Sequence, residues 1–176
     1  SLVEEIERRV EKLAEEVKRL VERDRKEVEK LEKESRDTVR EIEELADRLR
    51  DAVEKERDED SLRKKLEELI RTIEEILKES RRLLEELIRT STEILKRLKE
   101  KLEELIRRVE ELLKRNPDDE MRKVLTRLRE EVRRLLDELR RSLEDTKRTV
   151  EDLERKNKTV VDELRKTVAE LERRAR

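Results

Sequence analysis

The sequence predicts an all-α protein, an up-down-up antiparallel three-helix bundle that is long, nearly untwisted and built as a single domain over residues 1–176. Charged residues make up 58% of the chain, yet its apolar residues recur at helical spacing, which is typical of long helices rather than of disorder. Helix-breaking stretches occur at only two places. The apolar pattern also repeats every 18 residues, which constrains how the helices pack.

The first helix is expected to begin at once, because Ser1 and Glu4 have the spacing of a capping box. On its outer face a glutamate often precedes a lysine or arginine by four residues, as Glu5 precedes Arg9, and such pairs favour an exposed helical surface. Two breaks then divide the chain into three helices, which we expect at about 2–57, 61–115 and 118–175.

Each break contains residues that end one helix and start the next. The stretch 57–61 has no apolar residue, and Asp60 or Ser61 can cap the second helix. Pro117 disfavours helix in the residue before it, so the second helix should stop near residue 115. The two aspartates that follow the proline favour the positive end of a new helix dipole. Links this short force neighbouring helices to run antiparallel.

The repeat is clearest in the hexapeptide LEELIR, which occurs at 66–71, 84–89 and 102–107. Eighteen residues are five turns at about 3.6 residues per turn, so the pattern returns to the same face without superhelical drift. On every helix the apolar set fills one arc of roughly 140°. Three similar stripes can satisfy one another, so we expect a monomer. Self-association into a larger bundle, or a groove offered to a separate helix, is the alternative.

Eight polar residues occupy apolar positions of the repeat. Folding the chain at its two turns places them in three groups, two of which draw on all three helices. We interpret them as hydrogen-bonded groups that disfavour shifted registers, because a slip would leave buried polar atoms without partners. The groups are Asp24, Ser91 and Ser142; Thr38, Ser80 and Asn157; and Ser35 with Thr146.

Other interpretations of these eight residues remain open. Serine and threonine within a helix often bond to their own i−4 carbonyl, and a slim bundle can admit water. Thr90 and Thr92 fall at the two edges of the stripe, as minor members or as solvent-facing residues. A buried carboxylate such as Asp24 can act as a general acid, but no His, Cys, Tyr or Lys accompanies it on the stripe.

The composition argues against an enzyme and against most binding functions. The chain has no His, Cys or Gly, so the usual zinc, di-iron, Ser-His-Asp and phosphate-loop sites lack their residues, and we expect no catalytic residue, metal site or cofactor. The 50 basic and 52 acidic residues interleave, so no basic face is expected for nucleic acid. We likewise expect no membrane span and no small-molecule ligand.

The 18-residue layering, a surface of Glu, Lys and Arg, the absence of glycine and the connector NPDD together resemble de novo, parametrically designed straight helical bundles with buried hydrogen-bond networks. The resemblance covers the whole chain. It implies a heat-resistant structural scaffold with no natural biochemical activity, or alternatively a subunit of a designed homo-oligomer or a helix-binding partner protein. It also implies no natural localisation: a soluble protein, cytoplasmic only when expressed recombinantly.

Overall fold

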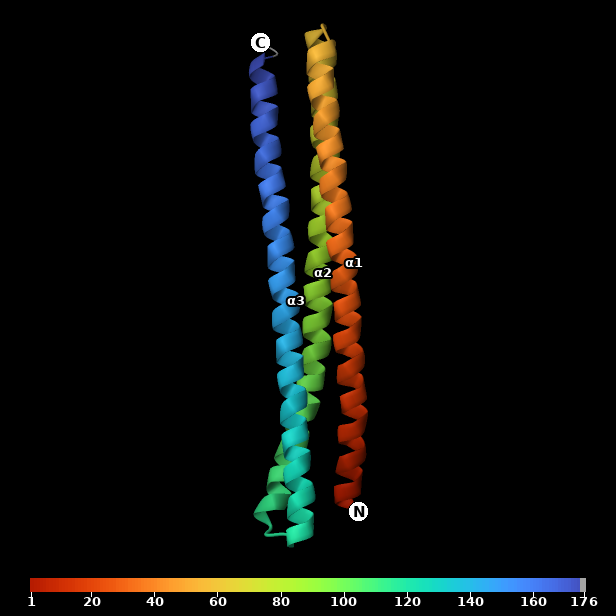
Figure 1. Ribbon diagram of the computed structural model, residues 1–176, viewed down its shortest axis with the longest axis vertical. Helices are drawn as coiled ribbons and strands as arrows, with labels where there is room; N and C mark the ends of the chain where they lie inside the picture. The colour runs from red at the N-terminus through yellow and green to blue at the C-terminus, as the bar shows by residue number, and fades with distance from the viewer. Residues whose placement is uncertain (175–176) are drawn as a thin grey trace. The chain divides into compact units, whose positions relative to one another are not determined.

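The computed structural model describes residues 1–174 of the chain. The described residues form three α-helices joined by two short turns, and the predicted all-α, three-helix fold is confirmed (Figure 1). The end predicted for the third helix, residue 175, lies outside the described residues. The helices are α1 (Leu2–Lys55), α2 (Glu59–Lys114) and α3 (Asp119–Arg174).

The start of α1 has the local contacts that the sequence predicts. The hydroxyl of Ser1 accepts a hydrogen bond from the backbone N–H of Glu4 at 3.4 Å, which satisfies one of the free donors of the first turn. One turn further on, Arg9 lies 3.8 Å from the carboxylate of Glu5, an exposed pair at the i, i+4 spacing.

The first turn has the predicted length but lies two residues earlier in the chain, because α1 ends at Lys55 and α2 begins at Glu59. The expected cap at Asp60 or Ser61 is wrong. Asp58 caps the helix instead: its carboxylate accepts the backbone N–H of Asp60 at 3.3 Å, the contact expected from the residue just before a helix.

The second turn follows the predicted chemistry and shifts the helix ends by only one residue. Asn116 has a φ of 58°, in the left-handed region that asparagine tolerates well, and its N–H bonds to the carbonyl of Leu113 at 3.4 Å. Pro117 follows and prevents α2 from continuing. Asp118 then caps α3 by accepting the N–H of Met121 at 2.8 Å.

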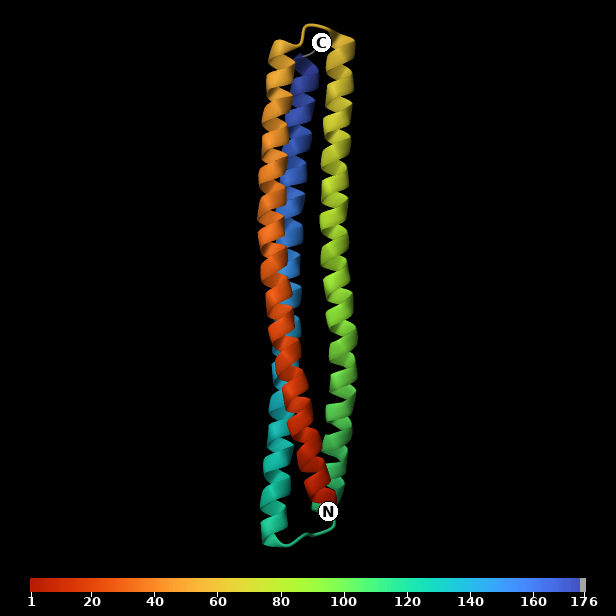
Figure 2. The same cartoon turned by 90° about the vertical axis from the view of Figure 1, so that its right-hand side faces the viewer.

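Contacts divide the chain into two compact units, each built from a segment of all three helices. Unit 1 contains Ser1–Glu27 and Leu87–Arg148, and unit 2 contains Val28–Glu86 and the chain from Thr149 onward. Within each unit the three segments lie side by side, and consecutive helices run in opposite directions (Figures 1 and 2). The expectations of a single domain and of helices without supercoil stay predictions.

Unit 1 has one continuous apolar core. Leucine, isoleucine and valine from the three segments form a single buried cluster, as expected when three stripes of about equal width face one another. Its members include Ile6, Val10, Val17, Leu98, Leu102, Val109, Leu125, Val132 and Leu139.

Unit 2 has a divided core. One buried cluster lies near the first turn and includes Leu49 and Leu66, and a second contains Ile42, Leu45 and Ile73. Many other stripe residues of this unit are only half-buried, among them Val39, Ile76, Val160 and Leu164. The polar residues of the stripe occur in both units: Ser35, Thr38, Ser80 and Asn157 in unit 2, and Asp24, Ser91, Ser142 and Thr146 in unit 1.

Candidate functional site

A buried hydrogen-bonded pair of polar side chains in unit 1 joins α1 to α2. The hydroxyl of Ser91 donates a hydrogen bond to Oδ1 of Asp24 at 3.0 Å. Asp24 is 2% exposed and Ser91 is 1% exposed, so both groups are removed from water. The structure thus brings together two members of the first predicted group, one from each helix.

Both residues of this pair stand where the repeat otherwise places large apolar side chains. Eighteen residues on either side of Asp24 lie Ile6 and Ile42, and both are core residues. Ser91 occupies the corresponding place between Ile73 and Val109, which are also buried. The pair therefore replaces apolar packing by one hydrogen bond, and each partner keeps the other from being a buried polar group without a partner.

Burial raises the pKa of the Asp24 carboxyl above its ordinary value of 3.8. The hydrogen bond from Ser91 and the positive charge of Arg23 favour the ionised form and offset part of this effect, while Glu27 adds to it. A carboxylate that has lost its water and has one hydroxyl donor is only partly compensated. Its ionisation is therefore linked to the stability of the folded chain.

The third expected member of this group, Ser142, is half-buried on α3 in unit 1. Among the described residues, it makes no side-chain hydrogen bond to Asp24 or Ser91. Two of the three predicted members are thus joined by a hydrogen bond in the structure, and both belong to α1 and α2.

A second pair lies in unit 2 and joins α2 to α3. Nδ2 of Asn157 donates to Oγ of Ser80 at 3.2 Å, and both residues are half-buried. The other amide atom of Asn157, Oδ1, is buried and has no hydrogen-bond partner within the described chain. Thr38, the expected third member, donates instead to the carbonyl of Glu34 at 2.8 Å, the local i−4 bond of the alternative interpretation.

The last predicted group is Ser35 with Thr146. Both side chains are buried, with 5% and 4% exposure. Ser35 belongs to unit 2 and Thr146 to unit 1, so the predicted association between them stays a prediction.

Sequence reasoning missed two buried polar atoms in unit 1. Thr92 Oγ1 and Arg129 Nε are both buried without a hydrogen-bond partner in the part of the chain that the structure describes. Thr92 lies at the edge of the stripe, where the sequence left open whether it faces solvent. Arg129 directly follows the core residue Leu128, but a long charged side chain on a helix is normally read as solvent-facing, so only its place beside the stripe could have signalled burial.

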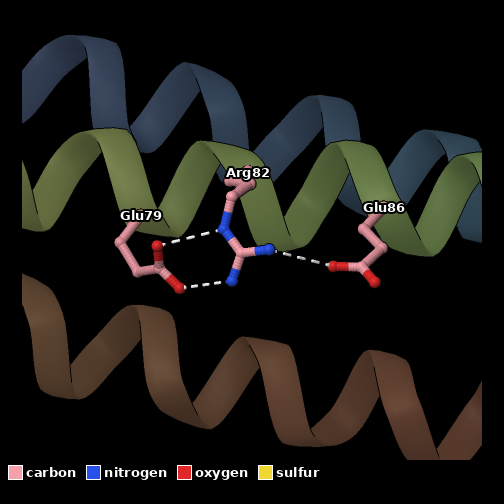
Figure 3. Close-up of polar contacts among 3 residues, drawn as sticks. All are labelled: Glu79, Arg82 and Glu86. Atoms are coloured by element: carbon pink, nitrogen blue, oxygen red, sulfur yellow. Dashed lines mark hydrogen bonds and ion pairs between the residues drawn. The ribbon is translucent and has the colours of Figure 1, made fainter.

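An exposed ion-pair group on α2 differs from these buried pairs. Arg82 donates two hydrogen bonds to the carboxylate of Glu79, at 2.7 and 3.1 Å, and a third to Glu86 at 3.3 Å (Figure 3). The interaction with Arg82 lowers the pKa of Glu79, and the pKa of Arg82 is raised in return. All three side chains are exposed, so solvent screens the group and its contribution to stability is small.

Metal binding and membrane insertion were the other properties considered at the level of the sequence. No group of three or more His, Cys, Asp or Glu in residues 1–174 is placed to hold a metal ion. None of the described helices contains a stretch apolar enough to cross a membrane.

The chain is compared here with protein families, curated proteins and solved structures. No family model matches the chain, and no curated protein matches it in sequence. The chain is similar to a solved structure described as a computationally designed three helix bundle, with 17% sequence identity and a TM-score of 0.48. The match covers 98% of this chain and 88% of that chain. That description names the class that the sequence resembles, while the three-helix fold itself rests on the helices and cores described above.

Proposed function

We propose that the chain is a designed structural scaffold with no natural biochemical activity, in which polar pairs of the core specify the register of the helices. The observation that carries this proposal is the hydrogen bond from Ser91 to Asp24, buried between two helices at positions where the apolar repeat is interrupted. No catalytic step is part of the proposal.

The sequence supports a designed origin through its regularity. Strong helix formers fill nearly every position, glycine is absent, and the stripe departs from its 18-residue repeat at only a few places. Where it departs, a hydroxyl, amide or carboxylate replaces a branched apolar residue. A stripe designed for stability alone would keep the apolar residue, because a buried polar pair adds little net stability over apolar packing.

The place of the Asp24–Ser91 pair suits a role in register. Asp24 lies 31 residues before the end of α1, and Ser91 lies 32 residues after the start of α2, so the two helices meet level with each other. The turn alone holds register weakly at that distance. A slip by one helical turn would leave the Asp24 carboxylate and the Ser91 hydroxyl buried without each other, at a cost of about 1–3 kcal/mol or more.

The test restores the apolar repeat and measures register directly. The variant combines Asp24→Ile with Ser91→Val. Spin labels are attached to Lys26→Cys on α1 and Glu111→Cys on α2, which are both exposed in unit 1, and the chain has no other cysteine. These two positions lie about 33 Å apart along the helix axes, so a slip of the helices changes the distance between the labels almost in full. We expect one narrow label-to-label distance with the pair present. In the apolar variant we expect a broader distribution that includes a second distance, displaced by about 5.4 Å.

The matched control is Ser142→Val, which restores the repeat on α3 in the same unit but removes no hydrogen bond found in the described residues. It should keep the narrow distance. If the apolar double variant keeps it too, the turns and the apolar packing set register, and the proposed role of the pair is wrong.

The scaffold proposal includes a monomer, with self-association as its rival. Absolute molar mass by light scattering with refractive-index detection decides between them, since the chain has no Trp or Tyr for detection at 280 nm. A mass of 21.6 kDa held over a wide range of concentration is the expected result. A multiple of that mass would assign the chain to an assembly instead.

A further inference from the structure

In unit 2, α1 and α3 border a groove of about 730 Å³. The apolar side chains that line it include Val39 from α1 and Leu153 and Val160 from α3. Val39 and Val160 are half-buried, so part of the apolar stripe of each helix remains accessible there. An apolar strip between two helices, with charged residues on both sides, is the surface that an amphipathic helix covers in groove recognition.

The groove has the length of a short helical contact. Its lining runs over residues 32–43 of α1 and 149–160 of α3. At about 1.5 Å per residue, each side extends roughly 16 Å, or about three turns. A helix laid along it would present apolar residues at i, i+3, i+4 and i+7 to the two half-buried valines.

The charges beside the strip identify the chemistry of the occupant. Arg36 and Arg40 line the groove on α1, and Arg155 and Lys156 line it on α3. The acidic residues of the α1 side, Glu32 and Glu43, stand at the two ends of the lining range. On α3, Asp152 is paired with Arg155 at 2.5 Å. Because Arg155 shares its charge with Asp152, the positive charge beside the strip comes from Arg36 and Arg40 on α1 and Lys156 on α3, and it favours glutamate beside the apolar stripe of a bound helix.

We propose that this groove is the docking site for a single amphipathic helix, whose Leu, Ile or Val stripe covers the half-buried Val39 and Val160 and whose flanking glutamates face the basic side chains of α1 and α3. The site adds a binding function to the scaffold and lies in unit 2. The register test above concerns α1 and α2 in unit 1, so failure of one proposal is distinguishable from failure of the other.

The probe is a synthetic, fluorescein-labelled peptide of about 18 residues, or five turns. It carries leucine at the stripe positions, glutamate at the two flanking positions, and alanine and glutamine on the far face. Fluorescence anisotropy against the full chain should show saturable binding. A second peptide with lysine in place of the flanking glutamates should bind at least about tenfold more weakly. Absence of saturable binding, or equal binding of both peptides, would overturn the proposal.

Two matched substitutions locate the binding. Val160→Lys places a charge in the groove, and Val124→Lys makes the same change 36 residues earlier, at a half-buried position of the same stripe in unit 1. We expect Val160→Lys to weaken binding of the glutamate-flanked peptide at least about tenfold and Val124→Lys to leave it unchanged. Equal losses in the two variants would mean that the peptide does not occupy the groove.

A charge reversal keeps the test decisive even if Val160→Lys disturbs folding. Arg36 and Arg40 are exposed, so Arg36→Glu with Arg40→Glu leaves the core intact. This variant should lose affinity for the glutamate-flanked peptide and gain affinity for the lysine-flanked one. An unchanged order of affinities would refute the assigned charge pattern.

A second copy of the chain is the competing occupant. Light scattering of the unmodified protein without peptide distinguishes it. A dimer that Val160→Lys abolishes and Val124→Lys preserves would assign the groove to self-association and overturn the docking of a separate helix. A monomer at all concentrations, together with peptide binding, supports the proposal.

Discussion

Units 1 and 2 are made from the same three helices and the same 18-residue repeat, yet their cores differ. Unit 1 has one continuous apolar cluster, and both residues of its polar pair, Asp24 and Ser91, are buried. Unit 2 has two separate clusters, and its pair, Ser80 with Asn157, is half-buried. A regular apolar repeat is therefore not sufficient for a continuous core.

The residues around the interruptions are packed differently in the two units. Along α1 in unit 2, Ser35 is buried, but its apolar neighbours Leu31 and Val39 are half-buried. On α3 in the same unit, Asn157 keeps one amide oxygen without a partner among the described residues. Unit 1 contains two such atoms, Thr92 Oγ1 and Arg129 Nε, so an unpaired polar atom does not by itself prevent the stripe from closing. The two units differ in the burial of their polar pairs and of the apolar residues beside them.

Truncating one leucine in each unit should produce the largest difference in stability between the two units. Leu128 in unit 1 is 4% exposed, and Leu164 occupies the same stripe two repeats later in unit 2 but is half-buried. Leu128→Ala should lower the free energy of unfolding by about 2–5 kcal/mol, and Leu164→Ala by roughly half of that or less. Urea unfolding followed by circular dichroism measures both. Equal losses would show that the two cores are equally well packed.

Removing the donor of each polar pair should give a smaller difference in the same direction. Ser91→Val leaves the buried Asp24 carboxylate without its hydroxyl donor, which should cost about 1.5–3 kcal/mol at pH 7. Ser80→Val leaves the half-buried Asn157 amide without its hydroxyl acceptor, which should lower the free energy of unfolding by about 1 kcal/mol or less. Urea unfolding followed by circular dichroism measures both losses. A larger cost for Ser80→Val would place the more important pair in unit 2.

The pH dependence of stability should separate the two pairs as well. Because burial raises the pKa of Asp24 above 3.8, the folded chain takes up a proton more readily than the unfolded chain. The resulting stabilisation is complete below pH 3.8 and is lost as the pH rises through the folded-state pKa. Asp24→Asn keeps the acceptor for Ser91 but has no charge, so it should be more stable than the unmodified protein at pH 7.

That advantage of Asp24→Asn should shrink toward zero as the pH falls below 3.8. Asn157→Ser in unit 2 provides the control, because its pair contains no ionisable group and its effect should be the same at every pH. The free energy of unfolding measured at several pH values tests both statements. A constant difference between Asp24→Asn and the unmodified protein would contradict the raised pKa.

The smallest effect is expected from the exposed ion pairs of Figure 3. Arg82→Gln removes the guanidinium that bonds Glu79 and Glu86, but water replaces those contacts on an open helix face. The midpoint of thermal unfolding should stay within the error of the measurement. A clear fall in the midpoint would mean that the ion-pair group, rather than the core alone, supports unit 2.

Much of the fold could be predicted from the sequence because its signals are local and periodic. The helix ends followed from capping residues and Pro117, and the one wrong cap arose because Asp58, Asp60 and Ser61 can all cap and only geometry selects among them. Counting residues from the turn placed Asp24 one helical turn from Ser91, its partner in the structure.

The details of the polar residues could not be predicted, because they depend on distances of a few tenths of an ångström. A hydroxyl in a helix can reach either a neighbouring helix or its own i−4 carbonyl, and the sequence does not decide between them. Thr38 takes the local bond, and Ser91 takes the interhelical one.

The turn between α2 and α3 also has a consequence for chemical ageing. An asparagine side chain loses ammonia when the backbone nitrogen of the following residue attacks its amide carbon, and that attack requires an N–H. Asn116, the residue with positive φ, is followed by Pro117, whose nitrogen carries no hydrogen. The connector that ends α2 is thereby closed to this route of deamidation, so prolonged heating should convert Asn157 to aspartate faster than Asn116.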